Sequence, residues 1–198
     1  YGGEIATVAS AFRAGKWPTI SGDETAPVAF LPCDNHLIAE TVVELYALDP
    51  QGTQVLAPLR SGQAGTKLLN ELCQQRFTAS KPAATLWSVE FDQVQRCGFH
   101  LGDQVLCTRN LWDLGLQNGS QGTIVEVEPE PEGPDDQKDR VLAWVEWDDG
   151  VRRALTLEML ADVELGFAIT VHKAQGSQWR RIIILVADTR LLDRTLLY

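Results

Sequence analysis

Residues 167–179 read FAITVHKAQGSQW, and they break an apolar run into a short polar loop. The sequence then returns to an apolar run, RIIILV, at residues 181–186. Two apolar runs of strand length, separated by a loop, predict two buried strands of a parallel sheet. A simple connection does not need Thr, His, Lys, Gln and Ser within nine positions. We therefore expect the loop at residues 170–178 to bind a ligand.

The same alternation of strand and helix patterns precedes this stretch. Residues 53–59 (TQVLAPL) form a second buried-strand pattern, and residues 26–33 (APVAFLPC) predict a further strand. Apolar residues at helical spacing predict helices over residues 35–47 and 66–77, and a short helix over residues 5–14. Strands that alternate with helices predict an α/β domain built on a parallel sheet.

After Pro82 the pattern changes to short alternating strands with tight-turn signals. Asn118-Gly119 and Asp149-Gly150 are the dipeptides that two-residue hairpin turns favour. We expect a small β-barrel over residues 95–165. Because the α/β pattern returns at residue 166, the barrel is predicted to be inserted between two parts of one domain, residues 1–94 and 166–198.

The charge of the chain is concentrated in one hairpin. The net charge is −10, but residues 126–149 contain ten acidic and two basic residues, so the rest of the chain is close to neutral. The total therefore does not exclude a nucleic-acid partner. Residues 128–139 (EPEPEGPDDQKD) contain three prolines and no aliphatic or aromatic residue, which predicts a long solvated loop.

Composition limits the other classes of function. The four cysteines form no C-x-x-C pair and the three histidines do not cluster with them, so no zinc site or other metal site is expected. We expect buried thiols in a reducing cytoplasm. No apolar run reaches eighteen residues, so no membrane partner is expected. The chain starts at Tyr1 without a leader pattern, and we expect it to be part of a longer protein.

Two polar loops follow predicted parallel strands, at residues 57–67 (APLRSGQAGTK) and 170–178 (TVHKAQGSQ). Each contains a cation, a glycine and the start of a helix, where free backbone N–H groups favour a phosphate. However, residues 62–67 do not match the phosphate-binding pattern G-x-x-x-x-G-K-[ST]. No strand ends in Asp-Glu to hold magnesium. The chain alone is therefore not expected to hydrolyse ATP.

Three ordered blocks resemble a known family. Residues 170–179 (TVHKAQGSQW) resemble motif V of superfamily 1 helicases of the RecD type, T-x-H-K-[SA]-Q-G-[SE]-[EQ]-[FW]. Residues 54–74 (QVLAPLRSGQAGTKLLNELCQ) resemble the motif IV region. Residues 102–124 (GDQVLCTRNLWDLGLQNGSQGTI) resemble the start of the SH3-like barrel that this family inserts into its second RecA-like domain.

The resemblance implies an ATP-dependent DNA helicase and translocase that moves 5′ to 3′, of the exodeoxyribonuclease V alpha subunit type. The chain would be its C-terminal portion, the RecA-like motor domain 2A with the barrel 2B. ATP and Mg²⁺ would bind between two such domains, with none held by this portion alone. The implied partners are single-stranded DNA, the N-terminal motor domain and further subunits of a nuclease complex.

The resemblance also implies roles for single residues. Arg60 matches the motif IV arginine that approaches the γ-phosphate, and it is the expected catalytic residue. Gln175, Gly176 and Gln178 match the nucleotide-facing part of motif V, although many members have Glu at the position of Gln178. Residues expected at DNA are Thr170, His172, Lys173, Arg109 and Asn110. The next family motif, with a second arginine for the ATP site, would begin after Tyr198.

Simpler interpretations remain open at this stage. The barrel and its acidic hairpin could form a protein-interaction module instead. We expect its tryptophans to pack in the core rather than to stack on bases, and Lys67 to be a solvated helix residue. The helicase interpretation predicts that Arg60 and Gln175 lie together at one edge of the sheet, and their placement on opposite faces would contradict it.

Overall fold

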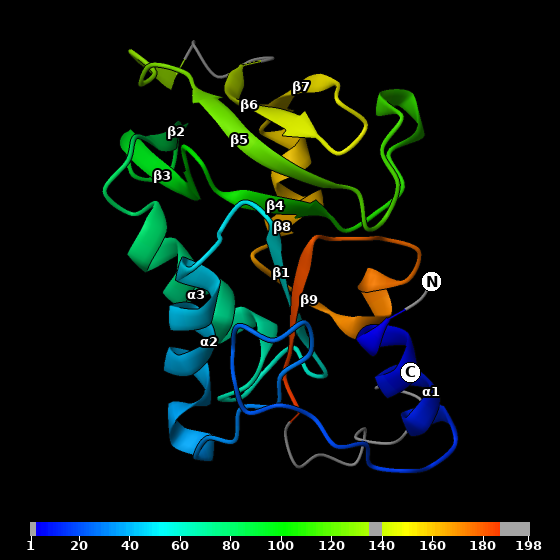
Figure 1. Ribbon diagram of the computed structural model, residues 1–198. Helices are drawn as coiled ribbons and strands as arrows, with labels where there is room; N and C mark the ends of the chain where they lie inside the picture. The colour runs from blue at the N-terminus through cyan, green and yellow to red at the C-terminus, as the bar shows by residue number, and fades with distance from the viewer. Residues whose placement is uncertain (1–2, 135–139, 187–198) are drawn as a thin grey trace.

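The computed structural model describes residues 3–134 and 140–186, and its two larger sheets lie one above the other (Figure 1). The lower sheet has the strand order β10-β1-β9, with all pairs parallel. Its central strand β1 (Thr53–Ala57) is buried along its whole length, and β9 (Ala168–Thr170) and β10 (Arg181–Ile184) flank it. The strands predicted from residues 53–59, 166–171 and 181–186 therefore lie in one parallel sheet, with the first of them in the middle, as the α/β prediction requires.

Two helices cover this parallel sheet. The helix α2 (Ile38–Ala47) follows a 3₁₀ turn, η1 (Asn35–Leu37), and α3 (Thr66–Phe77) follows β1. Tyr46 of α2 packs edge-on against Phe167, with ring centroids 6.0 Å apart. Leu69 of α3 and Val55 of β1 are fully buried in the same core, and burial of each such side chain contributes about 1.5–3 kcal/mol. The helix predictions at 35–47 and 66–77 are confirmed.

The upper sheet is antiparallel, with the order β7-β6-β5-β4-β8. Its strands are β4 (Gln104–Cys107), β5 (Gln121–Val127), β6 (Val141–Trp147), β7 (Arg152–Thr156) and β8 (Val163–Leu165). Among the described residues β7 and β8 are the two edges of this sheet, so the predicted closed barrel is not formed. The reason is local: a 3₁₀ segment, η4 (Glu158–Asp162), separates β7 from β8, and β8 has only three residues.

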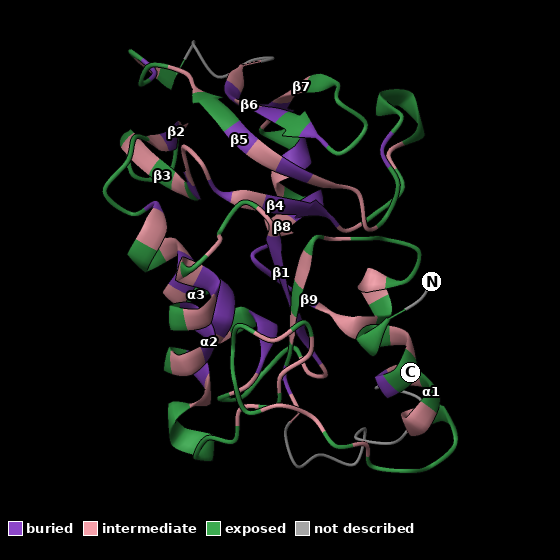
Figure 2. Ribbon diagram, viewed as in Figure 1, coloured by how far each residue is buried: buried purple, intermediate pink, exposed green. Residues whose placement is uncertain are grey.

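A separate hairpin packs against this upper sheet. The strands β2 (Ala83–Ser88) and β3 (Gln93–His100) pair with each other, and Ala84 and Phe99 enter the core of the upper sheet. Figure 2 shows that β1 and β4 are the most fully buried parts of the two sheets. The turn at Asp149-Gly150 joins β6 to β7 as predicted, and Gly150 has the positive φ of 75° that such turns require.

The buried side chain of Asn70 forms hydrogen bonds with the backbone where the chain passes from β8 to β9, between the two sheets. The Asn70 amide donates to the carbonyls of Leu165 (2.9 Å) and Ala168 (3.0 Å), and its oxygen accepts from the Ala168 N–H (2.7 Å). Gly166 lies so close to β4 that a Cβ there would be 2.9 Å from the Val105 carbonyl. The crossing is therefore fixed by α3 and β4 together.

A buried carboxylate makes a second connection between α3 and the upper part of the molecule. Asp103 is fully buried and accepts hydrogen bonds from Gln74 Nε2 (2.6 Å), the His100 N–H (2.7 Å) and the Thr78 hydroxyl. Because a buried carboxylate must be hydrogen-bonded to be tolerated, these contacts fix the orientation of α3 against the β3–β4 turn.

The N-terminal segment differs from its prediction. The short helix appears as α1 (Glu4–Arg13), but residues 26–33 form no strand, only an isolated bridge between Ser21 and Ala29. Pro27 and Pro32 lack the N–H groups that a central strand donates. The apolar side chains instead form a small aromatic cluster, in which Trp17 contacts Phe12 (5.2 Å) and Phe30 (5.4 Å). No helix within the described ranges is long and apolar enough to cross a bilayer.

Candidate functional site

The two polar loops leave the parallel sheet at the same edge. Ala57 and Thr170 are register partners at the ends of the parallel strands β1 and β9. The loop at residues 58–65 and the loop at residues 171–180 therefore start side by side (Figure 1). Ligands of open α/β sheets bind at this carboxyl edge. Arg60 and Gln175 belong to these two loops, in agreement with the predicted common edge.

The first loop is closed on itself by backbone hydrogen bonds. The N–H groups of Thr66 and Lys67, in the first turn of α3, donate to the carbonyls of Leu59 and Arg60, both at 3.0 Å. A Cβ on Gly65 would lie 2.7 Å from the Arg60 carbonyl oxygen, so glycine permits this close turn. The N–H groups of Thr66 and Lys67 are therefore not free to bind a phosphate, contrary to the prediction. What the loop presents is the Arg60 side chain, which is 69% exposed.

The second loop is a 3₁₀ turn, η5 (Val171–Ala174), followed by a tight turn. The Ser177 N–H donates to the Ala174 carbonyl at 3.1 Å. Gln175 has φ −61° and ψ 125°, and Gly176 has φ 89°. These angles fit a type II turn, which needs glycine at its third position. The Gln-Gly pair of the motif thus shapes the turn that presents Gln175, and both residues are exposed.

The remaining predicted residues of this loop differ in exposure. Thr170, at the end of β9, is half-buried, whereas His172 and Gln178 are exposed. Lys173 is only 18% exposed, because its side chain points back toward the upper sheet rather than into solvent.

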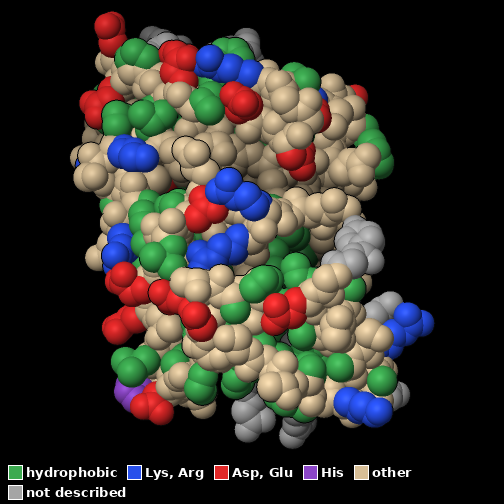
Figure 3. Space-filling model, in the orientation of Figure 1, with side chains coloured by type: hydrophobic (Ala, Val, Ile, Leu, Met, Phe, Trp, Pro, Cys, Tyr) green, Lys and Arg blue, Asp and Glu red, His purple; other side chains and the backbone are tan. Residues whose placement is uncertain are grey.

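A carboxylate that the sequence did not single out joins the two loops. Arg60 Nη2 donates to Glu164 Oε2 at 2.8 Å, and Lys173 Nζ donates to Glu164 Oε1 at 2.7 Å. Glu164 belongs to β8 of the upper sheet and is 34% exposed. Figure 3 shows basic side chains beside acidic ones at the middle of one face. No pattern in the sequence marks this residue, since its partners lie 104 and 9 positions away.

Arg109 and Asn110 lie in the β4–β5 loop, which also reaches this region. Arg109 forms an ion pair with Asp162 (3.3 Å) and is 70% exposed. The Asn110 side-chain oxygen accepts from the Asn118 N–H at 2.9 Å. A Cβ on Gly119 would be 3.7 Å from the Lys173 carbonyl oxygen, so this loop touches the second polar loop.

Tryptophans divide into packed and exposed groups. Trp147 is 2% exposed in the upper core, as predicted, and the Trp179 indole donates to Gln121 Oε1 at 3.0 Å. Trp112 contradicts the packing expectation, because it is 71% exposed on a short 3₁₀ turn, η2 (Trp112–Leu114). Reciprocal hydrogen bonds between Leu111 and the buried Leu116 close the base of this turn. Leu111 and Leu116 therefore hold the turn that carries the exposed Trp112 ring.

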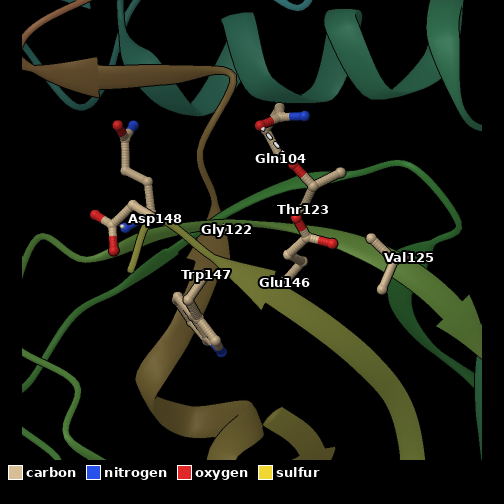
Figure 4. Close-up of a pocket in the computed structure, with 8 residues that line it drawn as sticks. Gln104, Gly122, Thr123, Val125, Glu146, Trp147 and Asp148 are labelled. Carbon is tan, nitrogen blue, oxygen red and sulfur yellow. Dashed lines mark hydrogen bonds between the residues drawn. The ribbon is translucent and has the colours of Figure 1, made fainter. Parts of the chain in front are cut away.

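A separate hollow lies on the upper sheet. Its volume is about 320 Å³, and it is lined by side chains of β4, β5 and β6 and the following residue, Asp148. Figure 4 shows Trp147 pointing away from Gln104, and Trp147 belongs to the buried core of the upper sheet. Glu146 and Asp148 make the hollow acidic, which disfavours a phosphate. We therefore place the candidate site at the sheet edge and not here.

The cysteines and potential metal ligands offer no competing chemistry. Burial raises the pKa of the Cys73 thiol to about 12 and also raises the pKa of Cys107, which keeps both thiols protonated and unreactive. Cys33 is exposed, contrary to its prediction. Within residues 3–134 and 140–186, no group of three or more His, Cys, Asp or Glu side chains is placed to hold a metal ion.

Known proteins resemble the chain in sequence and in fold. No protein-family model matches it. It is 28% identical over 151 residues to the ATP-dependent RecD2 DNA helicase of Deinococcus radiodurans, a match that covers 75% of the chain and 18% of the relative. It is 29% identical over 147 residues to the RecBCD enzyme subunit RecD of Mycolicibacterium smegmatis, covering 73% and 22%. The chain thus spans about a fifth of the length of these relatives.

The fold comparison agrees with the sequence relationship. The crystal structure of Bacteroides Pif1 bound to single-stranded DNA matches all of the chain and 46% of that protein, with a TM-score of 0.52 and 14% identity. At this identity the match concerns the fold alone. In sequence, the chain is similar over about three quarters of its length to RecD and RecD2 helicases.

Proposed function

We propose that the complete protein is an ATP-dependent DNA helicase that translocates 5′ to 3′ in the cytoplasm, and that this chain supplies its second motor domain. The observation that carries the proposal is the sheet edge where Arg60 and Lys173, from two separate loops, meet on Glu164. We assign residues 1–94 and 166–198 to the motor domain 2A, of which residues 1–2 and 187–198 lie outside the described part. Residues 95–165 correspond to the SH3-like module 2B, although their sheet stays open.

Half of an ATP site is proposed at this edge. Arg60 would stabilise the charge on the γ-phosphate, because a planar, exposed guanidinium can donate two parallel hydrogen bonds to phosphate oxygens. Gln175 and Gly176 would border the nucleotide, and Gln178 would approach its ribose. The cations and amides of this edge fit phosphate oxygens. They do not fit Mg²⁺, since Glu164 is already paired with two cations, so the Mg²⁺ ligands are assigned to the other motor domain.

The DNA track is proposed to run beside the second loop. Thr170 and His172 would contact the DNA backbone, and Lys173 would contact a phosphate when it leaves Glu164. Arg109 and Asn110 extend the track onto the β4–β5 loop, which touches the second loop at Gly119. We add Trp112 of that loop as a stacking surface for a base, because exposed aromatic rings bind single strands of any sequence.

The proposed partners follow from the same arrangement. They are single-stranded DNA, the N-terminal motor domain of the same protein, and further subunits of a nuclease complex. A protein-interaction module is not favoured, because Phe99 and the other apolar core side chains of the upper sheet are buried, and the hollow on that sheet is lined largely by polar side chains such as Gln104, Thr123 and Glu146.

Strand separation tests the proposal. The complete protein is mixed with a forked duplex that carries a single-stranded 5′ tail, and a matched fork with only a 3′ tail is the control. We expect separation of the 5′-tailed fork with ATP, and none with a non-hydrolysable analogue. Binding of single-stranded DNA without any ATP-dependent separation would refute the helicase assignment, and equal separation of both forks would refute the polarity.

A further inference from the structure

We propose that Glu164 is a counter-ion shared by Arg60 and Lys173, so that nucleotide bound at Arg60 weakens the binding of DNA at Lys173, and the reverse. The inference rests on the proposed function, and it assigns to the upper sheet a role in coupling the two ligands. Without ligands, one carboxylate of β8 holds both the arginine expected at the nucleotide and the lysine expected at DNA.

The geometry of the carboxylate supports sharing. Each of its oxygens takes one cation, Oε2 from Arg60 at 2.8 Å and Oε1 from Lys173 at 2.7 Å. The three side chains come from the β1–α3 loop, the β9–β10 loop and β8, so they meet only in the folded molecule. The two partners differ in exposure, with Arg60 at 69% and Lys173 at 18%. Arg60 is accordingly free to leave first, while Lys173 is held in a more enclosed pair.

A neighbouring carboxylate repeats the arrangement. Asp162, two residues before Glu164, pairs with Arg109 at 3.3 Å, and the Thr108 N–H donates to its backbone carbonyl. Three cations expected to contact phosphates are therefore paired with carboxylates at positions 162 and 164. In the absence of ligands, this segment of the chain itself supplies the negative charge that phosphates would bring.

The carboxylate at position 164 is held in place while its partners can move. Glu164 is the register partner of Leu106, in the pairing of β8 with β4. The next carbonyl, that of Leu165, accepts from the buried Asn70 amide. The cations, in contrast, reach Glu164 with long side chains from loops. Exchange of partners therefore requires movement of side chains only.

The sign of the coupling follows from the sharing. When a γ-phosphate attracts Arg60, the whole charge of Glu164 is left to Lys173, which then binds DNA less readily. By thermodynamic linkage, DNA that attracts Lys173 strengthens the hold of Glu164 on Arg60 to the same degree. Binding of nucleotide thus loosens this contact with DNA. Because the pairs are partly exposed, we expect an effect of about two- to five-fold in each affinity.

The test measures DNA affinity in the complete protein with Glu164→Gln, which removes the charge and keeps the shape. The probe is a fluorescent oligothymidylate, read by anisotropy with and without a non-hydrolysable ATP analogue. We expect Glu164→Gln to bind about three-fold more tightly than wild type without nucleotide at low salt. We also expect the weakening caused by the analogue to shrink toward zero. The matched control is Glu158→Gln, an exposed glutamate in η4, which should leave both values unchanged.

A double-mutant cycle separates counter-ion action from a general structural effect. Lys173→Gln should weaken DNA binding, and Glu164→Gln should have no further effect on DNA in that background. Freeing Lys173 should also steepen the dependence of log K on log salt by about 0.7, the value for one additional phosphate contact on a single strand.

The outcomes test the role of Glu164 separately from the proposed helicase function. If wild type binds DNA and responds to the analogue while Glu164→Gln behaves identically, the inference is wrong and the helicase proposal stands. The inference is also wrong if Glu164→Gln tightens binding equally in the Lys173→Gln background. If wild type binds neither single-stranded DNA nor nucleotide, the proposed function itself is refuted.

Discussion

Substitution of Asn70 by alanine removes the side-chain hydrogen bonds that hold the crossing between the two sheets. The side chain is 8% exposed and makes three hydrogen bonds, to the carbonyls of Leu165 and Ala168 and from the Ala168 N–H. Alanine leaves these three backbone groups without their side-chain partner at the crossing from β8 to β9. The variant therefore tests whether the crossing depends on α3.

The expected magnitude follows from the number of bonds. A net hydrogen bond contributes about 0.5–1.5 kcal/mol, and a buried polar group left unsatisfied costs about 1–3 kcal/mol. For three bonds we expect Asn70→Ala to lower the free energy of unfolding by about 3 kcal/mol. Since domains are stable by about 5–15 kcal/mol, the loss is a large part of the total. Asn70→Asp should also destabilise, because it keeps the acceptor and turns a negative charge toward two carbonyl oxygens.

Urea unfolding followed by tryptophan fluorescence measures the effect. With a slope of about 2–3 kcal/mol/M, the midpoint should fall by about 1 M with an unchanged slope. Glu71→Ala is the matched control, since it changes the adjacent, exposed position of α3, where we expect a change within about 0.5 kcal/mol. If the two variants differ by less than about 0.5 kcal/mol, the junction is held by something other than Asn70.

Three further predictions concern single side chains. Trp112→Ala should weaken binding of single-stranded DNA by about 1–3 kcal/mol and leave unfolding nearly unchanged, whereas unaltered DNA affinity in titrations would remove Trp112 from the track. Arg153 holds the pKa of Asp149 at about 2, below its usual value, so the pair stabilises the fold above about pH 4, the unfolded value, and this is lost as the pH falls through 2. Urea titrations of Asp149→Asn should therefore differ from wild type at pH 5 and converge with it near pH 2, and a difference that persists at pH 2 would contradict the assignment. Gly176→Ala should cost about 1 kcal/mol because its φ is 89°, and an unchanged midpoint in urea would mean that the turn can rearrange.

Local patterns predicted the helices and the parallel strands well. The helices at residues 35–47 and 66–77 follow from apolar spacing and from the turn residues that stop them, information carried by neighbours in the sequence. The prediction of a strand at residues 26–33 is wrong, also for a local reason. It followed from the apolar residues of this segment and gave too little weight to Pro27 and Pro32, which cannot donate hydrogen bonds to a neighbouring strand.

Features that depend on distant residues could not be predicted. The open upper sheet has a more local reason, the 3₁₀ segment η4 between β7 and β8, which the alternating pattern of the sequence did not reveal. The sequence did not single out Glu164, and only folding brings Arg60 and Lys173 to it. The exposure of Trp112 likewise depends on the closed turn beneath it. The resemblance to a helicase family named the site residues, but not the contacts among them.

The most direct test of the central claim is the separation of ATP turnover from DNA binding at Arg60. In the complete protein, Arg60→Ala should lower the kcat of DNA-stimulated ATP hydrolysis by about 10³-fold or more, as removal of an arginine at a transferring phosphoryl group does. Its Kd for single-stranded DNA without nucleotide should stay within about five-fold of wild type, the shift that loss of one partner of Glu164 allows. Unchanged kcat, or a loss of DNA affinity as large as the loss of turnover, would contradict the account.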